Sequence, residues 1–219
     1  MKVNLFVSES KFLERSRTAL FNARNHPEIR PLMADFGMDE SKLTEGDTFH
    51  HHARSMKELS DREEKESRLS SATYQQAFEE FQALFKRHQD FVRIFFKDDP
   101  QVLISLGVSG KFPRRYSEVF DKAKAFYAAA QLDPGLQQQL NQVKITSDVV
   151  ADSLSKLDAL LASRSHFDKE MGESQEVTQS KNMAMLKLKA YMDKFDSIAK
   201  LAMYDRPQLM EVLGIFVRS

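Results

Sequence analysis

Cysteine is absent from this 219-residue chain. Without thiols the protein forms no disulfide, thiolate nucleophile or zinc–thiolate site, and we expect it to reside in the reducing cytoplasm. An excess of either charge is missing too, because 32 Lys and Arg residues balance 32 Asp and Glu residues. Nucleic-acid-binding proteins usually carry a basic excess that neutralises phosphates. We therefore expect no nucleic-acid partner.

Apolar stretches are short throughout the chain. None approaches the roughly 20 residues that a membrane-spanning helix needs, so the sequence predicts no membrane span. The apolar run at the N-terminus is brief, and Asn4 interrupts it. This segment is too short for the hydrophobic part of a signal peptide.

Glycine and proline are scarce, with seven and six residues. No proline lies between Pro31 and Pro100 or between Pro134 and Pro207. Long intervals without helix breakers, rich in Glu, Lys, Gln, Ala and Leu, favour helix. No segment shows the alternating pattern of a strand. The sequence therefore predicts an all-α protein.

What the chain does contain is a clear amphipathic pattern. Its best example is a series of residues four and three positions apart: Tyr74, Phe78, Phe81, Phe85, His88, Val92 and Phe95. This spacing is typical of a helix in a bundle or coiled coil. Because His88 lies within an apolar series, we interpret it as a buried, hydrogen-bonded histidine whose pKa is lowered by desolvation. Such a residue would make the fold sensitive to acid.

A repeat is the most informative feature. Segments 98–108 and 205–215 share Asp, Pro, Gln, Leu and Gly at matching positions, 107 residues apart. The same interval pairs Pro27 with Pro134 and Phe81 with Leu188 without a gap. In the shared ending, Asp98 or Asp99 can cap a short helix that begins at proline, and the glycine can stop it.

The ending Pro-Gln-Leu-x-x-x-Leu-Gly-Ile at 207–215, with its echo at Pro100, resembles the closing motif of a group of uncharacterised bacterial duplicated helical-bundle proteins. The resemblance implies a fold built from a doubled helical unit. It implies no activity, cofactor or functional residue.

We expect a first repeat unit at 1–108, a connecting loop at 109–116 and a second unit at 117–219, packed together as one domain. Helices are predicted near 9–24, 28–36 and 39–97, and again near 116–131, 135–143 and 146–204.

The long predicted helices pose a choice. Residues 60–73 contain few apolar side chains, and the matching segment contains Gly172. We therefore favour a turn there, which gives duplicated helical hairpin units and a four-helix-type bundle with short accessory helices and a pseudo-two-fold repeat. A continuous helix of nearly 60 residues, about 87 Å long, is the alternative. It is supported by the seven-residue phase kept from Leu43 to Val92.

Asp47, His50 and His51 are the candidates for a metal site, because Asp47 and His51 lie one turn apart on a helix. The repeat disfavours such a site, since Leu157 and Asp158 stand where the first repeat has His50 and His51. The alternative is a polar helix surface with one imidazole packed against the core. The basic cluster Lys111, Arg114 and Arg115 is interpreted as a solvated loop.

No motif in the sequence carries a catalytic or cofactor signature, so we expect no enzyme and no cofactor. The leading hypothesis is a structural protein that presents helix faces to a protein partner or to another copy of itself. The alternative is a bundle that binds a small apolar ligand or a metal in a pocket lined by Met and Phe.

Overall fold

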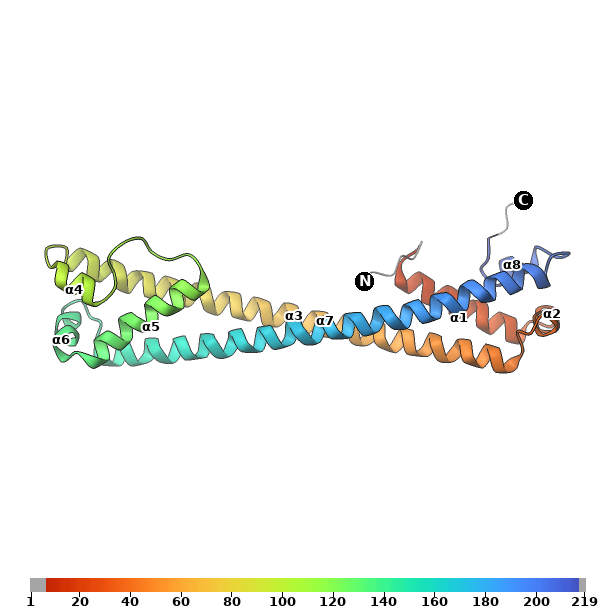
Figure 1. The fold of residues 1–219 in the computed structure, drawn as a ribbon, viewed down its shortest axis with the longest axis horizontal. Helices are drawn as coiled ribbons and strands as arrows, with labels where there is room; N and C mark the ends of the chain where they lie inside the picture. Colours follow the sequence, from red (N-terminus) through yellow and green to blue (C-terminus); the bar gives the residue numbers. More distant parts are fainter. Residues whose placement is uncertain (1–6, 217–219) are drawn as a thin grey trace. The chain divides into compact units, whose positions relative to one another are not determined.

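The computed structural model describes residues 7–216, and these form eight α-helices and no strand (Figure 1). The helices are α1 (Glu9–Asn25), α2 (Ile29–Asp35), α3 (Glu40–Phe95), α4 (Pro100–Ser105), α5 (Tyr116–Leu132), α6 (Pro134–Gln142), α7 (Ser147–Ala202) and α8 (Leu209–Val212). The all-α prediction is confirmed. Among these helices none is long and apolar enough to cross a membrane. Most of the N-terminal segment weighed as a signal peptide lies outside the described residues.

Local chemistry explains where the short helices begin and end. The Asp99 carboxylate accepts a hydrogen bond from the Val102 amide and caps α4, whose first residue is Pro100. Asp133 caps α6 in the same manner. Gly107 follows α4 with a φ of +64°, a left-handed conformation that glycine adopts without steric cost. The predicted cap and stop of the first closing motif are thus confirmed.

The predicted turns in the long helices are wrong. Both α3 and α7 are single helices of 56 residues. Polar composition did not break α3, because its charges pair along the helix, as between Arg54 and Glu58 at 3.0 Å and between Lys57 and Asp61. In α7, one internal glycine, Gly172, costs only about 1 kcal/mol relative to alanine, and its neighbours maintain the helix.

The chain forms two compact units. Unit 1 comprises residues 1–65 and 172–219, and unit 2 comprises residues 66–171. Each unit therefore contains part of α3 and part of α7. This division of the chain differs from the division at 108 and 117 that the repeat suggested, since each compact unit draws on both sequence repeats.

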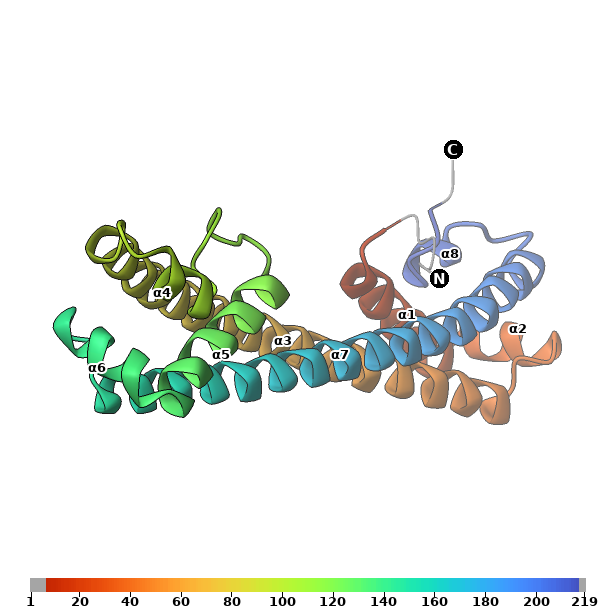
Figure 2. The same cartoon turned by 60° about the vertical axis from the view of Figure 1, so that its left-hand side comes forward.

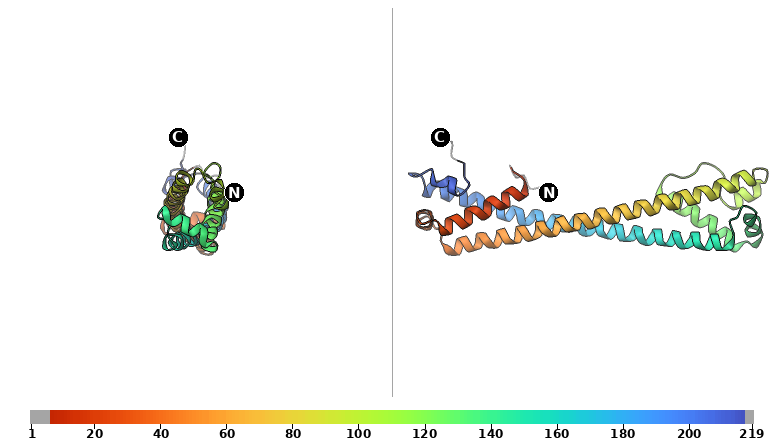
Figure 3. Two further views of the ribbon diagram at one scale, coloured as in Figure 1. Left: turned by 90° about the vertical axis from the view of Figure 1, so that its left-hand side faces the viewer. Right: turned by 180° about the vertical axis from the view of Figure 1, so that it is seen from behind.

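Unit 1 is built from α1, α2, the first part of α3, the last part of α7 and α8 (Figures 1 and 3). Its core joins Leu20 of α1, Met33 of α2 and Leu43 of α3 to Leu188 and Phe195 of α7. Three helical segments thus surround this core, and the short helices close its end.

Unit 2 contains the rest of α3, then α4, α5, α6 and the first part of α7 (Figure 2). Its core is richer in aromatic residues. Phe85 of α3 contacts Phe126 and Tyr127 of α5, with ring centroids 5.8 and 5.9 Å away. Leu157 of α7 and Leu140 of α6 complete the same buried cluster.

Two pairs of helices follow the interval seen in the sequence. α1 and α5 each have 17 residues and begin at Glu9 and Tyr116, which are 107 positions apart. α3 and α7 each have 56 residues and begin at Glu40 and Ser147, again 107 positions apart. The short helices differ, since α2 has 7 residues and α6 has 9, while α4 has 6 residues and α8 has 4.

Candidate functional site

The residues considered for a metal site have other partners in unit 1. The Asp47 carboxylate accepts a hydrogen bond from the Arg24 guanidinium at 2.6 Å. The His50 ring is buried, and its Nε2 lies 3.1 Å from the carbonyl oxygen of Leu13. Burial lowers the pKa of His50.

His51 remains exposed next to His50. Within residues 7–216 the ligand atoms of Asp47, His50 and His51 do not gather closely enough for one ion. The structure therefore places one imidazole against the core and one on the surface, and it gives the predicted metal site no supporting geometry.

His88 occupies the core of unit 2, as its place in the apolar series predicted. Its side chain is buried, and its Nδ1 lies 2.9 Å from the hydroxyl oxygen of Tyr127. Desolvation lowers the pKa of His88 to about 4, and the nearby cations Arg87 and Lys156 act in the same direction. Burial also raises the pKa of Tyr127, to about 12. Both groups are therefore neutral at pH 7.

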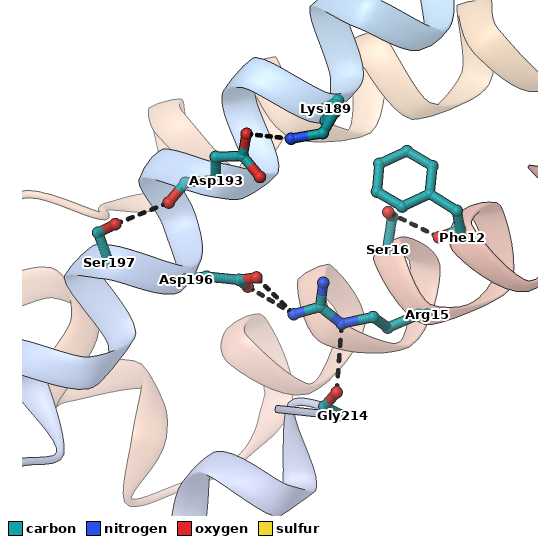
Figure 4. Close-up of polar contacts among 8 residues, drawn as sticks. All are labelled: Phe12, Arg15, Ser16, Lys189, Asp193, Asp196, Ser197 and Gly214. Carbon is teal, nitrogen blue, oxygen red and sulfur yellow. Dashed lines mark hydrogen bonds and ion pairs between the residues drawn. The ribbon is translucent and has the colours of Figure 1, made fainter. Parts of the chain in front are cut away.

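A set of hydrogen bonds made by Arg15 in unit 1 was not predicted from the sequence. The Arg15 guanidinium donates to both carboxylate oxygens of Asp196 at 2.7 and 2.6 Å, and its Nε donates to the carbonyl oxygen of Gly214 (Figure 4). One side chain of α1 thereby joins α7 and the segment after α8. Because it links three separate segments of unit 1, we assign Arg15 a structural role. Sequence periodicity gives no signal for a pair 181 positions apart.

The basic loop residues Arg114 and Arg115 are exposed, as predicted. Arg93 of α3 fixes this loop by donating to the carbonyl oxygens of Val108 and Gly110 at 2.8 and 2.6 Å. The loop is thus held by backbone contacts, with its own guanidinium groups left in solvent.

Two arrangements of side chains in unit 2 resemble functional sites, but the geometry of each argues against that function. The Ser70 hydroxyl and the Glu170 carboxylate both face Nδ1 of His166, at 3.1 and 3.8 Å. A proton relay needs the two groups on opposite ring nitrogens, so this trio does not activate the serine.

The second arrangement is a box of three aromatic rings in unit 2. The rings of Tyr74, Tyr116 and Phe167 surround a guanidinium carbon at 5.2, 5.9 and 5.3 Å. That carbon belongs to Arg164 of the same unit, which also pairs with Asp168 at 2.9 Å. The cation–π site is therefore already filled by the protein itself.

An exposed apolar face remains near the end of α3 in unit 2. Phe91, Ile94 and Phe95 are 45%, 74% and 55% exposed. Spacings of three and four residues place them on one side of the helix. Val92, on another side of α3, and Phe96, just after the helix, are buried. We call the three exposed residues the α3 face, and it is the candidate functional site.

The chain matches no protein-family model, no curated protein and no solved structure. The resemblance of the closing motif to bacterial duplicated helical-bundle proteins therefore stays a prediction, and function must be argued from the residues.

Proposed function

We propose that the chain is a non-enzymatic structural protein that associates with a second molecule of itself through the α3 face. The observation that carries this proposal is the exposure of Phe91, Ile94 and Phe95 on one side of a helix that buries Val92 on another side. Contiguous exposed apolar residues mark protein interaction sites. Aromatic residues are also enriched at the centres of such sites.

The charges around the α3 face favour a second molecule as the partner. Antiparallel pairing about a two-fold axis between positions 92 and 93 brings Phe91 next to Ile94 of the second molecule. Asp98 lies in the turn that follows α3, and the same pairing brings this turn near Arg87 of the second molecule. Arg87 is exposed, and the Asp98 side chain is 89% exposed. A two-fold interface requires such self-complementarity, and opposite charges at its rim set the register.

We also propose that the chain is a tandem duplication, as in the group that its closing motif resembles. The recurrence of helix lengths and helix starts at an interval of 107 residues supports this proposal. The absence of cysteine supports a cytoplasmic location.

Sedimentation velocity from low micromolar to submillimolar protein tests self-association. We expect a concentration-dependent increase in mass for the wild type, and a monomer at every concentration for the double variant Phe91→Ser, Ile94→Ser. Leu201→Ser is the matched control, because Leu201 occupies the position of Ile94 in the second repeat and is 63% exposed. It should leave the association unchanged.

A charge exchange tests the register of the interface. Arg87→Asp should weaken association by about tenfold, because each dimer then has two like-charged contacts. Adding Asp98→Arg should restore it. A wild type that stays monomeric throughout, or a double exchange that fails to restore association, would refute this proposal.

A further inference from the structure

Unit 1 contains a groove of about 650 Å³ between the α2–α3 connection and α7. Apolar atoms of Phe36, Phe49 and Ile198 line it, and three lysines stand around them: Lys42, Lys187 and Lys194. Small-molecule sites generally span roughly 300–1,000 Å³ and combine an apolar lining with a few polar groups. The groove fits this description in both size and composition.

Tyr191 holds the floor of the groove in one position. Its hydroxyl donates to the carbonyl oxygen of Lys42 at 2.7 Å and to the sulfur of Met38 at 3.4 Å. Its ring packs against Gly46, where no side chain intervenes, and lies 5.9 Å from the Phe49 ring. The aromatic floor is therefore formed before any ligand arrives, which reduces the entropic cost of binding.

The charges of the groove select a negative ligand. Lys42 pairs with Glu45 at 2.8 Å, so these two groups neutralise each other. Lys187 and Lys194 are exposed, and neither pairs with a carboxylate in the described part of the chain. Because they precede and follow Tyr191 by about one turn of α7, both ammonium groups lie along the aromatic floor.

The second unit provides an internal comparison. At the interval of 107 residues, Lys187 corresponds to Glu80 and Phe49 corresponds to Lys156. These exchanges remove one cation beside the apolar floor and replace an aromatic ring of the floor with a charge. The groove chemistry therefore belongs to unit 1 alone and is not a general consequence of the fold.

From this combination we infer that the groove binds a small single-chain amphiphile with one anionic head group. The apolar chain lies over Phe36, Phe49 and Ile198, and the head group accepts hydrogen bonds from Lys187 and Lys194. This site belongs to unit 1 and is independent of the α3 face of unit 2, so either proposal can fail without the other.

Titration calorimetry of the full chain with dodecanoate, kept below its critical micelle concentration, tests the inference. We expect saturable binding of one dodecanoate per chain and weaker binding of the uncharged dodecanol. The double variant Lys187→Gln, Lys194→Gln should lose about tenfold or more in affinity for dodecanoate, because it removes both cations that contact the carboxylate. Its affinity for dodecanol should not change.

Two further variants separate the groove from nonspecific adsorption. Phe36→Ser should weaken the binding of both compounds, because Phe36 is 50% exposed and contributes to the apolar lining. Lys200→Gln, at an exposed lysine of α7 outside the groove, is the matched control and should change neither affinity. Absence of saturable dodecanoate binding would overturn the inference. Equal dodecanoate affinity in the wild type and the double lysine variant would do the same, as would binding of an acidic peptide in place of dodecanoate.

Discussion

Replacing Gly46 with alanine should destabilise unit 1, although alanine is the better helix former. A Cβ atom at position 46 would lie 2.6–2.7 Å from Cε1, Cζ and the hydroxyl oxygen of Tyr191. Carbon atoms in contact normally stay 3.5–4.0 Å apart. The ring would have to move, and with it the hydrogen bond from its hydroxyl to the carbonyl oxygen of Lys42.

The magnitude follows from two opposing contributions. Alanine favours a helix interior over glycine by about 1 kcal/mol. Overpacking a filled interior costs about 1–3 kcal/mol, and loss of the Tyr191 hydrogen bond adds about 1 kcal/mol. We therefore expect Gly46→Ala to lower the free energy of unfolding by about 1–3 kcal/mol.

The decisive measurement is a double-mutant cycle with Tyr191→Leu, chosen because Leu84 holds the equivalent position in the first repeat. Urea unfolding followed by circular dichroism gives the four free energies of unfolding. Without the ring, Gly46→Ala should stabilise the protein by about 0.5–1 kcal/mol. The same loss of stability in both backgrounds would show that the close approach of Tyr191 is not the cause.

Two other substitutions test the core of unit 2 and the continuity of α7. The folded-state pKa of His88, about 4, lies below its unfolded value of 6.5, so the stability that the neutral imidazole contributes is complete above pH 6.5 and is lost as the pH falls toward 4. His88→Phe, which copies Phe195, should reduce the loss between pH 7 and pH 4 by about 3 kcal/mol in urea titrations; an unchanged pH profile would contradict a buried, neutral imidazole. Gly172→Ala should raise the free energy of unfolding by about 1 kcal/mol, because a Cβ there meets no atom within 4 Å. Gly172→Pro should lower it sharply, whereas a local turn at this glycine would tolerate proline better than alanine.

Local features of the fold were predictable from the sequence. The region predicted as helix at 39–97 is α3, Glu40–Phe95, and the one at 116–131 is α5, Tyr116–Leu132. Periodicity also identified His88 as a core residue, because a polar residue in an apolar series shares the burial of its neighbours. These inferences depend only on residues within a few turns of one another.

Features that depend on distant partners were not predictable. Gly46 is visible in the sequence, but the need for glycine at this position comes from the close approach of the Tyr191 ring, 145 positions away. Likewise, Asp47 stood as a metal candidate because Arg24, its actual partner, lies on another helix. The prediction of a turn near Gly172 was wrong for a different reason. One glycine lowers the stability of a helix by less than the packing and charge pairing of the surrounding residues raise it.

The buried contacts show that the two proposed repeats are energetically linked. Gly46 of the first repeat meets Tyr191 of the second, and His88 of the first meets Tyr127 of the second. Since every compact unit draws its core from both repeats, a change in one repeat alters packing against the other. Ser153 and Leu84 stand 107 positions from Gly46 and Tyr191, so the contact of a glycine with a tyrosine ring in unit 1 has no counterpart of the same residues in unit 2. Because each core takes buried residues from both, neither proposed repeat alone holds a complete core.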